Sequence, residues 1–283
     1  IRAVFVNERD IASEILTQTY FIGLQPPERG YTLSLVFEYD DLFGEDGIYV
    51  TGKEYDEWYL SGGSSEEAPT PNFEKSLEVG ATAELLDESG DVLNQAVGLR
   101  LQGASARRER RKRLTIASRE EYSGSDTFQA TLYEGVSTHA VMLKSYFSDT
   151  LASRLVENRS VAVQRSIPVR VFLNGEFLYD SFMLERYDKR YFQQHYNVDG
   201  FILVKNGTVK GEDISSEDNI RYQEYMGWIS DTDFSDPQEW AAFQEQTDVQ
   251  SYIDYIVTNY YLCNIDLSDN HNYVLWRSTS RGK

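Results

Sequence analysis

The chain has 283 residues, 41% of them hydrophobic, which is enough for one large domain or two modest ones. Its net charge of -19 excludes nucleic acid and anionic membranes as the main partners, because both attract basic surfaces. No apolar run approaches the roughly 20 residues that cross a bilayer, and the single cysteine, Cys263, excludes an intrachain disulfide and a cysteine-based zinc site.

The first part of the chain is predicted to be rich in strands. Residues 31–37 have the composition of a strand, and residues 61–71 are predicted to form a loop because they are rich in Gly, Ser and Pro. Residues 79–86 and 96–101 are predicted strands on either side of the turn sequence Asp-Glu-Ser-Gly at 87–90. This pattern predicts a β-hairpin.

A basic segment follows this hairpin. Between positions 100 and 113 lie seven of the 27 Lys and Arg residues, against a single Glu109: Arg100, Arg107, Arg108, Arg110, Arg111, Lys112 and Arg113. The positive charges of this cluster repel one another. Either the protein's own carboxylates or a ligand phosphate is therefore expected to offset them.

The strand predicted over residues 112–118 decides which way Lys112 points. Because side chains alternate along a strand, Lys112 shares a face with Leu114 and Ile116 and is expected to face the core or a cleft. A lysine on an apolar strand face after a turn of small residues is typical of folds that hold phosphates. The alternative is a solvated edge strand whose cations prevent aggregation.

Helical patterns dominate the second half. An exception is residues 169–179, which are predicted to form a hairpin because Asn174 and Gly175 suit the two positive-φ positions of a type I′ turn. Helices are predicted over residues 143–156, 188–196, 217–228, 237–244 and 247–263. Strands come first and helices later, which favours the α+β class.

A polar cluster lies between the last predicted helix and a predicted buried strand at residues 273–276. Residues 264–272 hold two carboxylates, three amides and a histidine. Carboxylate and amide oxygens suit Mg²⁺, and a carboxylate there can accept a proton from a hydroxyl nucleophile. The alternative is a polar turn whose side chains bond to the local backbone.

Motifs in the expected order along the chain resemble the spore-coat protein H-like (CotH) kinase family. The resemblance runs from about residue 30 to the C-terminus. It rests on GIYVTG at 47–52, GLRLQGAS at 98–105 with Lys112 downstream, PVRVFLNGEF at 168–177 followed by LERYD at 184–188, and Asn264-Ile-Asp266 with Asn270 and Asn272.

The resemblance implies an atypical protein-kinase-like fold over residues 24–283. It implies an N-terminal antiparallel β-rich lobe at about 24–135, and a mainly helical C-terminal lobe with a hairpin at about 136–283. Residues 1–23, in which 19–22 alternate as a strand does, look like the remnant of a preceding module or a linker.

The implied activity is phosphorylation of protein serine or threonine with ATP and Mg²⁺. The implied partners are therefore a nucleotide and a protein substrate, with no nucleic acid and no membrane insertion. Members of the family are spore-coat or secreted bacterial proteins, so an extracellular, cell-surface or spore-surface location is expected.

The resemblance also implies roles for single residues on the nucleotide side. Lys112 would pair with the nucleotide phosphates, and Ser105 and Arg107 would lie in the turn above them. Glu185 matches the acidic residue after the hairpin and would line the nucleotide cleft.

On the catalytic side, Asp266 matches the aspartate that accepts the substrate proton and also binds metal. Asn270 or Asn272 would be a further metal ligand. The chain stops at Lys283, before the family's second metal-binding aspartate, so we expect the domain to be C-terminally incomplete and inactive as it stands.

Two other functions stay open at this point. The same fold could be a non-catalytic binding or scaffold module on a cell surface. A glycosidase would need two carboxylates, such as Glu185 and Asp266, about 5 to 9 Å apart around a sugar.

Overall fold

The computed structural model describes residues 1–25, 27–103, 105–145, 147–198, 200–210, 215–265, 267 and 272–279. Its α+β class agrees with the prediction. The chain divides into two compact units, one made of residues 1–150 and 165–186 and the other of residues 151–164 and 187–283. No helix in the described ranges is long and apolar enough to cross a membrane.

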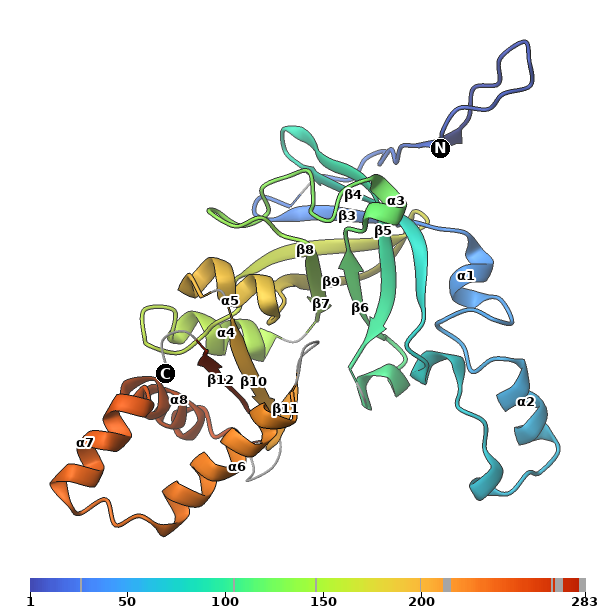
Figure 1. Cartoon of the computed structure of the whole chain (residues 1–283). Coiled ribbons are helices and arrows are strands. Elements are labelled where there is room, and N and C mark those ends of the chain that lie inside the picture. The colour runs from blue at the N-terminus through green and yellow to red at the C-terminus, as the bar shows by residue number, and fades with distance from the viewer. Residues whose placement is uncertain are drawn as a thin grey trace. The chain divides into compact units, whose positions relative to one another are not determined.

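The first unit is built on a closed barrel (Figure 1). Neighbouring strands are antiparallel, except that β3 and β8 run parallel where the barrel closes. In order around the barrel, its strands in the described part of the chain are β3 (Tyr31–Val36), β4 (Glu78–Asp87), β5 (Gly90–Gln102), β6 (Arg113–Ala117), β7 (Ala140–Lys144), β9 (Glu176–Glu185) and β8 (Ser166–Leu173).

Alternate residues of these strands fill the barrel interior. The predicted inward positions Leu114 and Ile116 are buried in the core cluster, as expected for this face of β6. Apolar side chains from the other strands join them in one cluster, among them Leu33, Leu35, Val97, Leu99, Val141 and Met183.

Both predicted hairpins form. Asn174 and Gly175 have φ angles of 47° and 86°, as a type I′ turn requires. The Asn174 side chain also accepts from the Phe37 N–H at 3.0 Å and donates to the Phe37 carbonyl at 3.1 Å. The expectation that this hairpin belongs to the helical part is not met: β8 pairs with β3 and β9 pairs with β7, so the hairpin completes the barrel.

The helix predicted over residues 143–156 begins too early. Leu143 and Lys144 belong to β7, because this apolar segment pairs with β6 and β9, and helix α4 covers Phe147–Leu155. Several short helices were not predicted: α1 (Tyr39–Phe43), α2 (Lys53–Leu60), α3 (Glu120–Ser123) and the 3₁₀ turns η1 (Ser65–Glu67), η2 (Asn72–Glu74) and η3 (Ser105–Arg108). The first of the 3₁₀ turns lies within the predicted loop at 61–71.

The second unit holds four of the predicted helices. They are α5 (Lys189–Tyr196), α6 (Ser216–Asp231), α7 (Pro237–Gln246) and α8 (Val249–Tyr261), and their N-caps are Asp188, Ser215, Asp236 and Asp248. Each cap side chain accepts a hydrogen bond from a backbone N–H in the first turn of its helix, which fixes where the helix begins.

A three-stranded sheet accompanies these helices, in the order β11 (Thr208–Lys210), β10 (Phe201–Lys205) and β12 (Val274–Ser278). Phe192 packs against Trp276 of β12, with ring centroids 4.9 Å apart. The strand predicted at 273–276 therefore exists, but the prediction that it is buried is wrong. Val274 is 38% exposed and Leu275 is 42% exposed, because β12 is an edge strand that pairs with β10 alone among the described strands.

The N-terminal segment is partly attached to the barrel. Strands β1 (Arg2–Ala3) and β2 (Leu16–Thr17) form a small hairpin that projects away from the barrel (Figure 1), and residues 19–22 are not a strand. Thr19 is held by the buried carboxylate of Glu84 on β4, which accepts from the Thr19 N–H at 2.8 Å and from its hydroxyl. Phe21 packs on Phe172 with ring centroids 4.5 Å apart.

This attachment is tested by the substitution Glu84→Ala. The change leaves the half-buried donors of Thr19 without the Glu84 acceptor, which costs about 1–3 kcal/mol for each donor. Urea denaturation is expected to show a loss of at least about 2 kcal/mol in the free energy of unfolding. Glu88→Ala, at an exposed position in the same hairpin, is the control and should change stability by no more than about 0.5 kcal/mol. Equal stability of the two variants would show that the segment is not part of the barrel fold.

Candidate functional site

Lys112 immediately precedes β6, in line with its inner face, and is only 7% exposed. Its ammonium donates to the backbone carbonyls of Arg107 and of Glu109, the latter at 3.2 Å. It also lies over the Phe73 ring, 4.2 Å from the centroid, in cation–π geometry. Burial lowers the pKa of the Lys112 ammonium. The cation is thus enclosed by groups of its own protein.

Turn η3, which precedes Lys112, is fastened to η2 by two arginines. The Arg107 guanidinium donates through Nη1 to the carbonyls of Glu74 at 2.9 Å and Lys75 at 3.2 Å. Arg108 pairs with the Glu74 carboxylate at 2.6 Å. Ser105, at the start of η3, is exposed. The protein's own carbonyls and carboxylates therefore offset part of the basic segment, as one of our two alternatives expected.

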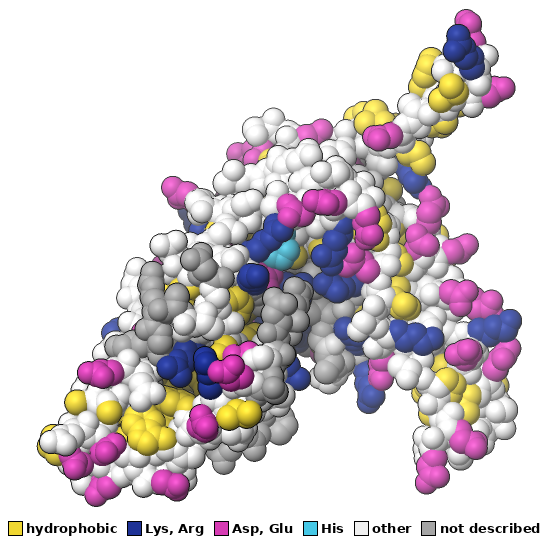
Figure 2. Space-filling model, in the orientation of Figure 1, with side chains coloured by type: hydrophobic (Ala, Val, Ile, Leu, Met, Phe, Trp, Pro, Cys, Tyr) yellow, Lys and Arg dark blue, Asp and Glu magenta, His cyan; other side chains and the backbone are white. Residues whose placement is uncertain are grey.

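A second carboxylate lies near the start of the basic segment. Glu78 of β4 accepts two hydrogen bonds from Arg119, at 2.9 and 2.8 Å, and lies 3.6 Å from the Arg100 guanidinium. The Arg119 hydrogen bonds are the main reason that the pKa of Glu78 is lowered. Figure 2 shows Lys and Arg side chains lying next to Asp and Glu side chains over much of the visible face.

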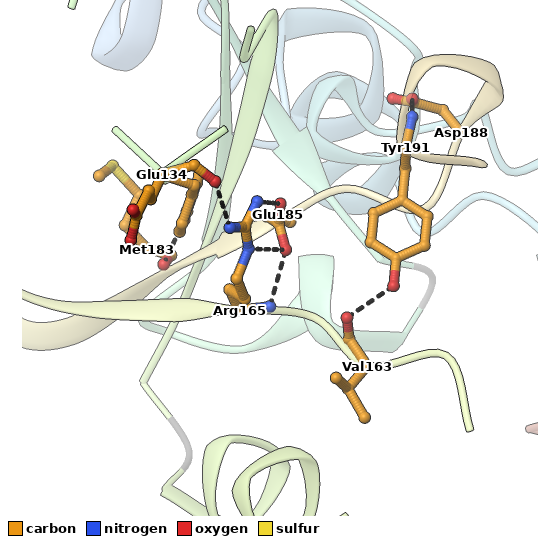
Figure 3. Close-up of polar contacts among 8 residues, drawn as sticks. Glu134, Val163, Arg165, Met183, Glu185, Asp188 and Tyr191 are labelled. Carbon is orange, nitrogen blue, oxygen red and sulfur yellow. Dashed lines mark hydrogen bonds and ion pairs between the residues drawn. The ribbon is translucent and has the colours of Figure 1, made fainter. Parts of the chain in front are cut away.

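Glu185, at the end of β9, is 5% exposed and bound by Arg165 (Figure 3). Its Oε2 accepts from the Arg165 backbone N–H at 2.9 Å and from Nε at 3.1 Å, and its Oε1 accepts from Nη2 at 2.7 Å. Arg165 also donates to the Glu134 carbonyl at 2.8 Å and lies 5.4 Å from the Tyr133 ring centroid. Both oxygens of this carboxylate accept from Arg165, so the geometry does not suit the proton-donating acid of a glycosidase.

Arg165 was missed by sequence reasoning, and the reason is a register shift. Next to the turn, Leu173 faces Glu176 and Phe172 faces Phe177. Between Val171 and Phe172 the pairing shifts by one residue, so that Ser166 faces Leu184. The next pair along this register is Arg165 and Glu185. Without the bulge Arg165 would face Leu184, and the ion pair would not form.

The structure does not bring Lys112 and Glu185 into contact. The Lys112 carbonyl accepts from the Tyr179 hydroxyl at 3.5 Å, which places Lys112 at the Tyr179 end of β9. Tyr179 and Glu185 are six residues apart on that strand, a length of about 20 Å. The two predicted site residues therefore belong to different ends of the barrel.

Two of the predicted metal ligands, Asp266 and Asn270, lie outside the described residues. Asn272 is described and has a φ of 61°. Its neighbour Tyr273 donates its N–H to the Asn206 side chain at 3.3 Å, at the start of β12. Within the described ranges, no group of three or more His, Cys, Asp or Glu side chains is placed to hold a metal ion.

Comparison with known families bears on these motifs. A family model described as CotH kinase protein matches residues 99–283. The chain belongs to the CotH kinase family. The match takes in η3, β6, the β8–β9 hairpin and the polar cluster after α8, which carried most of the resemblance, whereas GIYVTG at 47–52 lies before the matched residues. No curated protein matches the chain.

The Arg165–Glu185 pair is expected to contribute strongly to the stability of this CotH chain. Arg165→Met leaves the Glu185 carboxylate buried without its cation, which costs about 3–5 kcal/mol. Urea denaturation measures this loss.

The matched control is Arg170→Met, which breaks the pair with Asp180 in the same hairpin. The Asp180 side chain is 72% exposed, so this loss should not exceed about 1 kcal/mol. Equal losses from the two variants would contradict a special role for the buried pair.

Proposed function

We propose that this chain belongs to an atypical protein kinase that transfers phosphate from ATP, with Mg²⁺, to serine or threonine of a protein. The observation that carries the proposal is the family match over residues 99–283, which includes every residue to which we assign a role. We also propose a kinase-like fold for residues 24–283 and a cell-surface, spore-surface or secreted location in a bacterium.

Asp266 is proposed as the group that receives the substrate proton. The substrate hydroxyl oxygen forms a bond to the γ-phosphorus, the bond from that phosphorus to the β,γ-bridging oxygen breaks, and the hydroxyl proton passes to the Asp266 carboxylate. ADP is the leaving group. The donor set of Asp266 with Asn270 or Asn272 consists of carboxylate and amide oxygens, which fits Mg²⁺. When bound, Mg²⁺ would neutralise charge on the phosphates.

For Lys112 the structure supports a role different from the one expected. A direct contact with phosphate would require its ammonium to leave two carbonyl acceptors and the Phe73 ring. We therefore propose that Lys112 fixes turn η3, which presents the exposed Ser105 toward the nucleotide. Arg107 supports this placement, because its buried Nε–H has no acceptor among the described residues, and a phosphate oxygen would supply one.

Glu185 is proposed as a positioning residue. Its pair with Arg165 joins the end of β9 to the chain just before β8, and this fixes the segment that leaves the barrel. Substrate or nucleotide contacts would then come from neighbouring groups rather than from the Glu185 carboxylate itself.

The proposed chemistry is tested by Asp266→Asn in the full-length protein with labelled ATP and Mg²⁺. Loss of the proton acceptor is expected to lower label incorporation about 100-fold or more, while ATP still binds. Asp231→Asn, an exposed aspartate in α6, is the charge-matched control and should incorporate label as the parent does. Normal incorporation by Asp266→Asn would contradict the assigned role.

Calorimetry with ATP and Mg²⁺ separates the kinase from the alternative of a non-catalytic binding module. The kinase proposal expects saturable nucleotide binding by the full-length protein. Absence of nucleotide affinity in a folded sample would favour the binding module.

A further inference from the structure

A cavity of about 420 Å³ lies on the barrel, outside the residues assigned to phosphotransfer. One wall is the N-terminal segment 18–24, and the other consists of residues from β3, β4 and β5. We call it the strap cavity. Its apolar lining includes Phe21, Leu24 and Leu86, and its polar lining includes Thr32, Asp87 and Asp91.

The hydroxyl of Thr32 is the unusual feature of this cavity. Thr32 is 2% exposed, and its Oγ1 has no hydrogen-bond partner among the residues that the structure describes. Ser34, two residues along the same face of β3, bonds to the Thr19 hydroxyl at 2.8 Å, and Glu84 on that face accepts from Thr19 as well. Since buried polar groups are normally paired, the unpaired hydroxyl in the cavity wall indicates a missing polar partner.

The charge around this hydroxyl is negative. Asp87 accepts from the N–H of Ser89 at 2.7 Å and from its hydroxyl at 2.6 Å, and these bonds lower the pKa of Asp87, which keeps it ionised. Asp91 accepts from the Gln18 amide at 3.0 Å. No Lys or Arg is among the residues that line the cavity, all of which the structure describes. Arg170, opposite Thr32 on β8, is paired with Asp180.

We propose that the strap cavity binds a primary ammonium group carried on a short apolar stem. The ammonium would donate to Thr32 Oγ1 and to the carboxylate of Asp91 or Asp87, while the stem packs against Phe21, Leu24 and Leu86. The apolar walls favour such an organic cation over a bare metal ion, which prefers oxygen ligands on all sides. A lysine side chain of a protein and a free alkyl diamine share this chemistry.

The bonds of Glu84 prepare the cavity for this ligand. Thr19 lines the cavity and is held to β4 by Glu84, so the segment that forms the wall is already in place before binding. A wall that is fixed in advance reduces the entropy cost of binding a small ligand.

The test is an NMR titration of the whole chain with pentylammonium, and 1-pentanol serves as the uncharged control. Pentylammonium is expected to shift the amide signals of cavity residues in a saturable way. Thr32→Val and Asp91→Asn should each weaken this binding about tenfold, because each removes a partner of a charged donor. Glu176→Gln removes one charge from the exposed β8–β9 turn and should leave the affinity unchanged.

Thr32→Val removes an unpaired buried hydroxyl with little change of shape, so it should melt at or above the temperature of the parent protein. If it does not fold, Asp91→Asn decides the result. Equal binding of pentanol and pentylammonium, or parent-like affinity in the folded variants, would overturn the proposal.

Two further ligands identify the source of the ammonium group. Tighter binding of N-acetyl-lysine methylamide than of pentylammonium supports the proposal with a protein lysine as ligand. Tighter binding of 1,5-diaminopentane supports it with a free diamine. Failure of all three amines to shift the cavity signals overturns it.

Discussion

Closure of the barrel by the parallel pairing of β3 with β8 is the constraint on which the first unit depends. This pairing joins Tyr31 to Val169 and Leu35 to Leu173 across a long stretch of chain. The family match begins at Leu99, inside β5, yet β3, β4 and most of β5 precede that residue. The barrel therefore contains strands from before the matched residues as well as strands within them. All of these strands belong to the same compact unit.

Two buried charged groups of the barrel are bound by other groups of the protein. The Lys112 ammonium is bound by the carbonyls of the turn before it, and the Glu185 carboxylate is bound by Arg165. Removing a charge from water costs several kcal/mol unless partners compensate, so both groups are expected to rigidify their surroundings. In our account they prepare surfaces for a ligand: Lys112 through turn η3, and Glu185 through the end of β9.

Sequence reasoning succeeded where the signal was local. The Asn174–Gly175 turn, the capped helices and the inward face of Lys112 follow from short-range propensities and side-chain alternation. It failed where pairing was long-range or irregular: the β8–β9 hairpin joins β3, and the Arg165–Glu185 pair depends on a one-residue bulge. Helix α8 forms within the predicted range 247–263, but its apolar residues Tyr252 and Val257 are 55% and 59% exposed. Its Asp254 is buried and accepts from Ser160 and Gln250.

The central claim is that the Lys112 ammonium is an internal support of turn η3 and does not itself bind phosphate. NMR titration of the lysine Nζ signals, with and without saturating ATP and Mg²⁺, tests this claim most directly. We expect a Lys112 pKa below the ordinary value for lysine, because the ammonium is buried, and an Nζ signal that ATP shifts only slightly. A Lys112 that titrates together with the exposed lysines, or whose Nζ signal and pKa shift strongly when ATP binds, would contradict it.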